Sequence, residues 1–268
     1  MHLHTFYSDG TYSPQDLVRE AKKAGLSAIA VTDHDTVEAL ELSVAAGDEF
    51  AIEVISGIEL SCDYAGSEIH MLGYFIDCKN KELLDKLYGL KKNRIERIHK
   101  IVSKLNDMGL KLNVESVLDF ARYGTVGRLH VARALLKDKL VGSLQEAFQR
   151  FIGDKGPAYV CGFKLDPAEA INLIKKAGGI PVLAHPYTIG NDELIVEFKN
   201  LGLMGLEVYY PEHSQSMINF YLGLARELGL LVTGGSDCHG QAKSEAKIGS
   251  VMLAYEFVEK LKKAKRVL

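Results

Sequence analysis

Short runs of apolar, mostly branched residues recur along the chain, and segments with apolar residues at helical spacing lie between them. A bounded apolar run of about four to eight residues is typical of a strand that is buried on both faces. The sequence therefore predicts six buried strands, at residues 27–32, 53–58, 68–75, 179–184, 204–210 and 230–235.

Helical patterns separate most of these strands. Residues 13–25 begin with Ser13 as a cap and Pro14 at the first helical position, and they end at a glycine; residues 166–179 repeat this design. Alternating strands and helices indicate an α/β protein with a parallel sheet, and a chain of 268 residues favours closure into a TIM-like barrel.

The alternation stops near residue 80 and resumes near residue 158. Only helical patterns lie between, at residues 84–109, 113–124, 127–138 and 143–153. We therefore expect two domains. Residues 1–82 and 158–268 form the barrel, and residues 83–157 form an all-helical insertion domain that packs directly on it.

The net charge of −3 hides an uneven distribution. Residues 86–155 carry fifteen Lys or Arg and seven Asp or Glu, a balance of +8, whereas the rest of the chain carries −11. Two interpretations fit this basic insertion: ordinary solvated helix faces, or a surface that attracts an anionic substrate.

The composition argues against a membrane or disulfide-rich protein. No apolar run approaches the length of a membrane span, and nothing at the N-terminus resembles a signal peptide. The four cysteines lack C-x-x-C spacing and any dense framework. We expect a cytoplasmic protein with reduced thiols, without a membrane partner or an obligatory protein partner.

Residue types that bind metals recur along the chain, mostly at or near the ends of the predicted strands. His2 and His4 are spaced to leave one face of an extended segment, with Asp9 five residues further on. Further histidines and carboxylates stand at or near strand ends, or within a strand: His34, Glu59, His70, His185, Asp237 and His239.

Each residue alone has a structural explanation. Asp33, Asp35 or Asp237 could cap a helix, and His70 could be a hydrogen-bonded core histidine. Their coincidence favours a metal site, because the carboxyl ends of parallel barrel strands converge on one face. Imidazoles with carboxylates suit Mn²⁺, Fe²⁺ or Zn²⁺, and the lack of a cysteine cluster argues against a structural zinc site.

The motifs HLHTFYSDG, TDHDT, GIELS, EIHMLGYF, AHP and GGSDCHG together resemble the PHP (polymerase and histidinol phosphatase) superfamily of metal-dependent phosphoesterases. The resemblance implies a distorted (β/α)7 barrel with two or three divalent ions, Mn²⁺ foremost. It also implies three groups of ligands: His2, His4 and Asp237; Asp9, His34 and His239; and His70 with His185, with Glu59 bridging two ions.

The predicted insertion resembles one branch of this superfamily. R-x-x-R at Arg94 and Arg97, VGRLHVARALL, AFQRFIG and PAYV are similar to the TrpH/YciV-type group, described as 3′,5′-nucleoside bisphosphate phosphatases and 5′-to-3′ exoribonucleases. That family has several strand residues before its first histidine, and here only Met1 precedes it. Either the first strand is unusually short or the chain starts at an internal methionine.

The expected reaction is attack on phosphorus by hydroxide that the metal ions activate. The sequence contains no Ser-His-Asp arrangement with a nucleophile elbow and no Gly-rich phosphate loop, so no protein nucleophile is expected. The expected substrates are a nucleotide bisphosphate or a short RNA with a 5′-phosphate.

The basic insertion is the predicted source of substrate contacts. Arg128 near a helix start is the foremost phosphate ligand, and Arg94 and Arg97 share a helix face; all three could instead be surface arginines. His130 and His213 could contact phosphate or simply pack. Two other functions remain open: a histidinol-phosphate-type phosphatase, and a non-catalytic nucleic-acid-binding module that retains a metal core.

Overall fold

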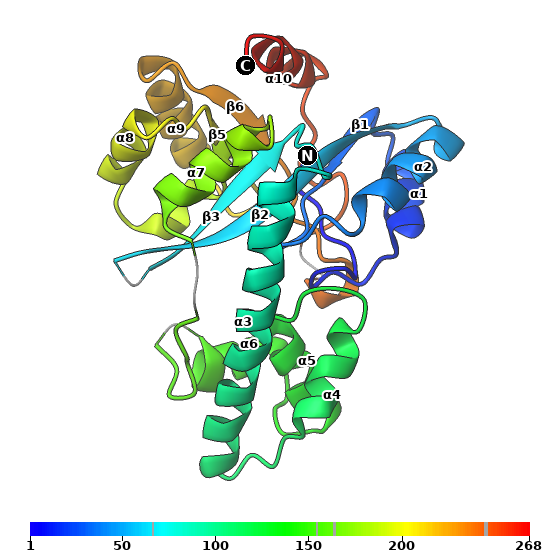
Figure 1. The fold of residues 1–268 in the computed structure, drawn as a ribbon, viewed down its shortest axis with the longest axis vertical. Coiled ribbons are helices and arrows are strands. Elements are labelled where there is room, and N and C mark those ends of the chain that lie inside the picture. The colour runs from blue at the N-terminus through cyan, green and yellow to red at the C-terminus, as the bar shows by residue number, and fades with distance from the viewer. Residues whose placement is uncertain (66, 154, 163–164, 244–245) are drawn as a thin grey trace.

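A single curled sheet lies at the centre of the larger part of the molecule (Figure 1). The structure is a computed structural model that describes residues 1–268 except 66, 154, 163–164 and 244–245. The sheet has six strands in the order of the sequence, and all six correspond to predicted strands. They are β1 (Ala28–Val31), β2 (Glu53–Tyr64), β3 (Ser67–Tyr74), β4 (Ile180–Leu183), β5 (Gly205–Tyr209) and β6 (Leu231–Gly234).

The prediction of an all-parallel sheet is wrong at β3. This strand runs antiparallel to both β2 and β4, whereas β1 pairs with β2, and β4 with β5 and β6, in parallel. The reason is the length of β2, which continues past residue 58 to Tyr64 and leaves two residues before β3 starts. A connection this short makes a hairpin, because a parallel pair needs a crossover of a dozen or more residues.

Residues 2–4 occupy the place where a seventh strand was expected. Leu3 makes only an isolated bridge to Cys238, and the described residues form six strands in total. The backbone of this segment is nevertheless bonded on both sides. The amide of His4 donates to the carbonyl of Cys238 (3.0 Å), and the amide of Thr32 donates to the carbonyl of Leu3 (2.9 Å). The segment thus links the chain after β6 to the chain after β1.

Helices cover the sheet and bury most of its apolar residues. They are α1 (Pro14–Lys23), α2 (Leu40–Phe50), α7 (Pro167–Lys176), α8 (Glu193–Asn200), α9 (Gln215–Glu227) and α10 (Glu256–Lys265). As predicted, Ser13 caps α1 by accepting from the amide of Asp16, and Pro14 is its first residue. Leu17, Val18 and Phe198 are among the fully buried side chains of the main core.

The chain between β3 and α7 forms helices at all four predicted places. They are α3 (Lys81–Asp107), α4 (Val114–Leu118) with the 3₁₀ turn η1 (Asp119–Ala121), α5 (Arg128–Lys137), and α6 (Leu144–Ala147) with the π-helical turn η2 (Phe148–Ile152). Within the described part of the chain, no helix is long and apolar enough to cross a membrane.

The helix α3 runs from the part of the molecule that contains the sheet into the lower, helical part (Figure 1). It contributes to two separate apolar cores. Leu83, Leu87 and Leu90 in its first half pack in the main core with the sheet and its helices. From Ile98 onward, α3 packs instead against α4 and α5. Residues of α6 and η2 also contribute to this second core, which is made from residues 98–160. We call residues 98–160 the helical lobe.

Asp166→Ala should lower the free energy of unfolding by about 1 kcal/mol, because it removes the cap of α7. The Asp166 carboxylate accepts from the amide of Glu169 (2.8 Å), and the Glu169 carboxylate accepts from the amide of Asp166 (3.3 Å). Denaturant unfolding measures the loss. Asn172→Ala, at an exposed position of the same helix, is the control and should change stability by no more than about 0.5 kcal/mol; an equal loss in both variants would contradict the capping role.

Candidate metal centre

The side chains predicted as metal ligands lie together at one edge of the sheet. His34, His185, Asp237 and His239 follow β1, β4 and β6 at their carboxyl ends, as expected for parallel strands. Glu59 lies inside the longer β2, and His70 faces it from within β3. We call the nine side chains the histidine–carboxylate cluster: His2, His4, Asp9, His34, Glu59, His70, His185, Asp237 and His239.

The backbone bonds of residues 2–4 explain why the chain begins with H-x-H. Alternate residues of this extended segment point in opposite directions, so Leu3 is buried in the main core. His2 and His4 then share the other side, where both are fully buried. The amide of Asp237 donates to the carbonyl of His2 (2.9 Å), which holds Asp237 beside this pair.

Glu59 is the centre of the cluster. Its Oε2 lies 3.0 Å from Nε2 of His2, 3.1 Å from Nε2 of His4 and 3.4 Å from Nδ1 of His34. Its Oε1 lies 2.9 Å from Nδ1 of His70 and 3.2 Å from Nε2 of His185. Burial alone would raise the pKa of Glu59, but the surrounding imidazoles hold it well below its usual value, so the carboxylate is ionised.

Two aspartates complete the cluster on either side of His4. Asp237 Oδ1 lies 3.0 Å from Nε2 of His4 and 3.3 Å from Nε2 of His2. Asp9 Oδ1 lies 3.1 Å from Nε2 of His239, and its Oδ2 lies 4.0 Å from Nε2 of His34. The carboxylates are therefore distributed among the imidazoles.

Three groups of donor atoms in the cluster are close enough to hold one ion each. They are His2, His4, Glu59 and Asp237; His4, Asp9, His34 and His239; and His34, Glu59 and His70. The first two contain the groups that the family resemblance implies, with His4 shared between them. The third differs from the implied pair, since it has His34 and Glu59 with His70; His185 lies beside it, with Nε2 3.3 Å from Nδ1 of His70.

The donor chemistry of the cluster requires positive charge. Burial alone would lower the pKa of His4, but Asp237 and Glu59 raise it to about 10. The pKa of His70 is likewise raised to about 9, against the effect of burial, by Glu59 and then Glu68. Nε2 of His4, Oδ1 of Asp9 and Nδ1 of His34 are buried without a hydrogen-bond partner in the described structure. Divalent cations among these atoms would satisfy all three.

Partners outside the cluster orient its imidazoles. The backbone carbonyl of Asp237 accepts from Nδ1 of His239 (2.8 Å), and a carbonyl can only accept, so Nε2 presents its lone pair to the cluster. Thr188 donates its hydroxyl hydrogen to the carbonyl of His185, so its Oγ1 accepts from Nδ1 of His185 (3.2 Å). Such outer partners are typical of histidines that bind metals.

Glu207 is a central outer partner that the sequence analysis missed. It is fully buried in β5, where its carboxylate accepts from Nδ1 of His2 (3.0 Å) and from the backbone amide of His185 (3.0 Å). Its signal in the sequence is an acid in the middle of the apolar run MGLEVYY, because a buried carboxylate in a strand needs partners.

The structure excludes helix capping by the two aspartates near β1. Asp33 accepts from the amide and hydroxyl of Thr5 (both 2.7 Å) and from the hydroxyl of Ser8 (2.6 Å), which holds the loop that carries Asp9. Asp35 accepts from the amide of Ser61 (2.9 Å), and α2 begins only at Leu40.

Asp237 and His185 have strained backbones. Their φ angles are +51° and +26°, in a region that residues other than glycine seldom adopt. Asp237 is held there by two further contacts to its Oδ2, from the hydroxyl of Tyr210 (2.9 Å) and from Nζ of Lys243 (2.9 Å). Strain of this kind is concentrated at functional sites in proteins.

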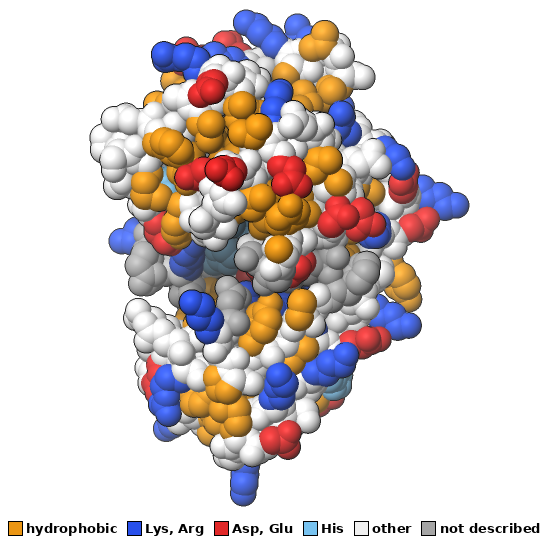
Figure 2. Space-filling view, turned by 90° about the vertical axis from the view of Figure 1, so that its left-hand side faces the viewer, with side chains coloured by type: hydrophobic (Ala, Val, Ile, Leu, Met, Phe, Trp, Pro, Cys, Tyr) orange, Lys and Arg blue, Asp and Glu red, His pale blue; other side chains and the backbone are white. Residues whose placement is uncertain are grey.

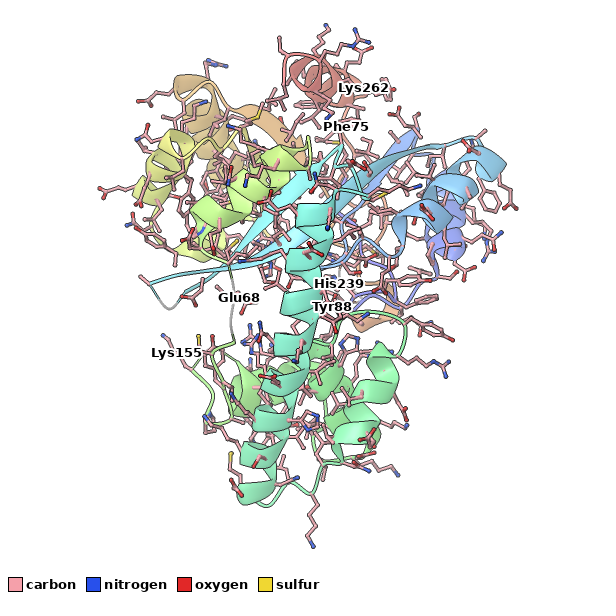
Figure 3. The ribbon with its side chains drawn as sticks, viewed as in Figure 1. Glu68, Phe75, Tyr88, Lys155, His239 and Lys262 are labelled. Atoms are coloured by element: carbon pink, nitrogen blue, oxygen red, sulfur yellow. The ribbon has the colours of Figure 1, made fainter. Side chains whose placement is uncertain are left out.

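A cavity of about 340 Å³ opens above the cluster, between the sheet and the helical lobe. We call it the cluster cavity. Asp9, His34, His70 and His239 line it from the cluster. Figure 2 shows histidine side chains deep in a hollow between the upper and lower parts of the molecule, beside Lys and Arg side chains. In Figure 3, Glu68 and His239 lie at the level where these two parts meet.

The three predicted arginines line the cluster cavity with different partners. Arg94 donates to Asp35 (2.7 Å), Ser61 (2.8 Å) and the carbonyl of Val126 (3.1 Å). Arg97 donates through Nε to the carbonyl of Val160 (2.8 Å), and its buried Nη2 makes no hydrogen bond to a described residue.

Arg128 is the first residue of α5 and is linked to the cluster through Glu68. Its Nη2 donates to Glu68 Oε2 (3.0 Å), and Glu68 Oε1 lies 3.2 Å from Nε2 of His70. Arg128, Glu68 and His70 therefore line the cluster cavity together.

His130 and His213 lie outside the set of residues that line the cluster cavity. His130 is buried at the start of α5, where its Nδ1 accepts from the amide of Gly127 (3.0 Å). His213 donates through Nδ1 to the carbonyl of Val208 (2.7 Å) and packs against the rings of Tyr187 and Tyr221. Nε2 of each is buried without a hydrogen-bond partner among the described residues.

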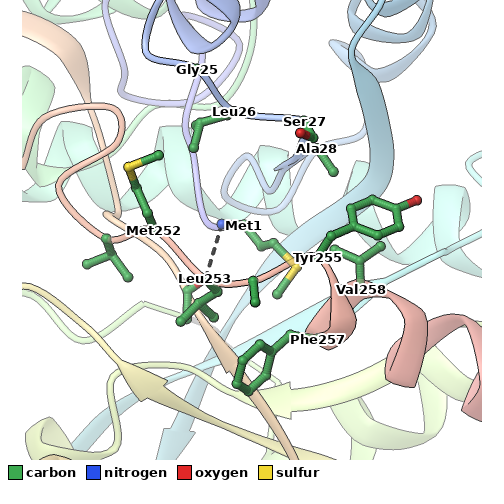
Figure 4. Close-up of a pocket in the computed structure, with 13 residues that line it drawn as sticks. Met1, Gly25, Leu26, Ser27, Ala28, Met252, Leu253, Tyr255, Phe257 and Val258 are labelled. Atoms are coloured by element: carbon green, nitrogen blue, oxygen red, sulfur yellow. Dashed lines mark hydrogen bonds between the residues drawn. The ribbon is translucent and has the colours of Figure 1, made fainter.

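A second cavity, of about 120 Å³, is lined by apolar side chains of Met1, Leu26, Met252 and Phe257, among others (Figure 4). None of the described residues that line it is Asp, Glu, His, Lys or Arg. Its described lining therefore lacks the histidine, carboxylate and guanidinium groups that line the cluster cavity.

Comparisons with known proteins agree with this geometry. A model of the PHP domain matches residues 1–156. The chain is 32% identical over 244 residues to the 5′-3′ exoribonuclease of Haemophilus influenzae, which covers 89% of each chain. It is 27% identical over 255 residues to the 3′,5′-nucleoside bisphosphate phosphatase of Chromobacterium violaceum, which covers 93% of this chain and 90% of that protein. A solved structure from Bifidobacterium adolescentis, named as a metal-dependent phosphoesterase, has a TM-score of 0.91 at 29% identity over 97% of this chain and 93% of that one.

Proposed function

Because this chain belongs to the PHP domain family, we propose that it is a metal-dependent phosphoesterase that hydrolyses nucleotide phosphoesters. Its proposed substrates are 3′,5′-nucleoside bisphosphates and short RNA with a 5′-phosphate. The relatives named as a 3′,5′-nucleoside bisphosphate phosphatase and a 5′-3′ exoribonuclease support this choice. One observation carries the proposal: a buried histidine–carboxylate cluster forms part of a cavity that arginines also line.

The nine residues of the histidine–carboxylate cluster are the proposed metal ligands, with Glu59 shared between ions. They fit two or three divalent first-row ions, with Mn²⁺ as our first choice and Fe²⁺ or Zn²⁺ as alternatives. When bound, such ions polarise a phosphoryl oxygen and make water acidic enough to act as a nucleophile near neutral pH.

The residues of this chain hold that site in position. Glu207 and Thr188 fix the ring orientations of His2 and His185, and Lys243 with Tyr210 holds the outer oxygen of Asp237. The pKa of Asp237 is held well below its usual value, because neighbouring histidines outweigh the effect of burial, so it stays ionised.

We propose the same domain division as the sequence suggests, with residues 1–82 and 158–268 as the metal-binding barrel and 83–157 as a basic helical insertion. The separate apolar core of the helical lobe supports this division. The insertion supplies Arg97 and Arg128 for the phosphate that is not cleaved. Arg94 lines the cluster cavity, and its hydrogen bonds to Asp35, Ser61 and Val126 also hold α3 against the barrel.

Steady-state hydrolysis under one metal condition tests the function. The substrates are a nucleoside 3′,5′-bisphosphate, the matching 5′-monophosphate, a short 5′-phosphorylated RNA and histidinol phosphate. We expect activity on the bisphosphate or the RNA that chelation abolishes and Mn²⁺ restores. Full activity in metal-free protein, or hydrolysis of histidinol phosphate alone, would contradict the proposal, and binding of RNA without any hydrolysis would favour a non-catalytic module.

Arg128→Ala should lower kcat/KM on a bisphosphate about tenfold, because it removes a charge-assisted contact of about 1.5 kcal/mol. Metal content should not change. The kcat/KM on a simple phosphodiester without a second phosphate should fall much less. Arg150→Ala, which removes an exposed arginine of the same lobe, is the control. Equal losses on both substrates would assign Arg128 to the cleaved phosphate or to support of the metal site.

A further inference from the structure

The cluster cavity has one apolar wall. Leu129, Leu144 and Phe148 line it from the helical lobe, whereas its other lining side chains are largely histidines, acids, arginines and a lysine. Gln145, with an exposed amide side chain, lies beside Leu144 on the same wall. The cavity is therefore amphipathic, with an anion-binding part and an apolar part.

The apolar wall is formed by three elements that meet at this point. Leu129 is in the first turn of α5, Leu144 is the first residue of α6, and Phe148 is the first residue of η2. Leu144 and Phe148 are half-buried, because each packs with part of its surface on the core of the helical lobe and leaves another part toward the cavity. Phe148 also opens a π-helical turn, a rare form that is found frequently at functional sites.

A nucleotide likewise has a charged part and a largely apolar part. Its phosphates need cations, whereas its base has flat faces that gain from leaving water and a polar edge that needs hydrogen bonds. Arg128 immediately precedes Leu129, so the charged and apolar parts of the cavity adjoin each other within one helical turn. The volume of about 340 Å³ is within the range of small-molecule sites.

We propose that Leu129, Leu144 and Phe148 bind the nucleobase of the substrate, with the ring of Phe148 stacked on it and Gln145 at its polar edge. This inference rests on the proposed function and makes it more specific, because the unit recognised is one whole nucleoside with its phosphates. Stacking on an aromatic ring accepts any base, so the enzyme should discriminate little among bases.

The test compares adenosine 3′,5′-bisphosphate with ribose 3′,5′-bisphosphate, which has the same phosphates and lacks the base. Stacking of one base contributes about 1–3 kcal/mol, so Phe148→Ala should lower kcat/KM on the adenosine compound about tenfold, chiefly through KM. Activity on the ribose compound should change less than about twofold. Phe148→Tyr, which keeps an aromatic face, should retain the activity of the wild type.

Two further variants separate stacking from packing. Phe148→Leu keeps an apolar side chain in the lobe core and removes the aromatic face, so it should show the same substrate-dependent loss. Phe120→Ala is the matched control, since Phe120 is half-buried in the same lobe core but does not line the cavity. It should affect the two substrates equally.

Equal losses on both substrates in the Phe148 variants would overturn the inference, as would a wild-type enzyme that hydrolyses the two substrates equally well. Both outcomes would leave the phosphoesterase proposal standing. Failure of the wild type to hydrolyse any of the phosphoesters with metal present would instead overturn the proposed function, and this inference with it.

Discussion

Glu59→Gln is expected to abolish tight metal binding and to lower kcat/KM by about three orders of magnitude. The reason is the position of Glu59, whose two oxygens contact five imidazoles of the cluster within 3.4 Å. Glutamine keeps the shape of the side chain and removes its charge. Loss of one partner of a buried charged cluster costs about 3–5 kcal/mol, which corresponds to about 10²- to 10⁴-fold in affinity.

The measurement is metal content after dialysis, together with Mn²⁺ titration of activity. Glu53→Gln is the matched control, because Glu53 is at the start of the same strand and its carboxylate pairs with Lys262 at 2.7 Å, away from the cluster. The control should keep both metal and activity. A Glu59→Gln variant that binds metal and turns over substrate like the control would remove Glu59 from the site.

Glu207→Gln is expected to weaken metal binding about a hundredfold, although Glu207 is not a proposed ligand. Outer partners of metal-binding histidines typically contribute 10- to 100-fold to metal affinity. We expect an effect at the upper end of this range, because Glu207 contacts both His2 and His185. The amide of glutamine cannot provide the negative charge that raises the basicity of His2. Excess Mn²⁺ should therefore recover much of the lost activity.

Recovery by added metal distinguishes this positioning role from a direct one. Glu197→Gln, which alters a carboxylate that accepts from the hydroxyl of Tyr64 at the surface, is the control and should require no more metal than the wild type. If Glu207→Gln stays inactive at every Mn²⁺ concentration while it remains folded, Glu207 contacts the metal or the substrate itself.

Local patterns were sufficient to predict the elements and most of the candidate site. The six strands and the four helical segments between β3 and α7 follow from hydrophobic periodicity, which depends only on neighbours along the chain. The positions of the histidines and carboxylates at or near strand ends predict that these side chains lie together, because the carboxyl ends of parallel strands converge on one face.

The antiparallel course of β3 could not be predicted, and the reason is the site itself. Residues 59–64 contain Glu59, Ser61 and Asp63, so the apolar pattern predicts a strand that ends at residue 58. These polar residues are part of β2, where Glu59 and Ser61 are buried by partners from elsewhere in the chain, among them His2 and Arg94. A buried polar strand looks like a loop in the sequence, because its partners are distant.

The sequence alone determined which elements form and which side chains are able to bind metal, since both depend on residue type and short spacing. The tertiary structure decided which of those side chains meet. Glu207 and His2 are 205 positions apart, and only the sheet brings them to 3.0 Å. The same holds for Arg128 and Glu68, which are 60 positions apart and are 3.0 Å from each other in the folded chain. Hydrogen bonds between distant residues depend on how whole elements pack, and no local pattern records that.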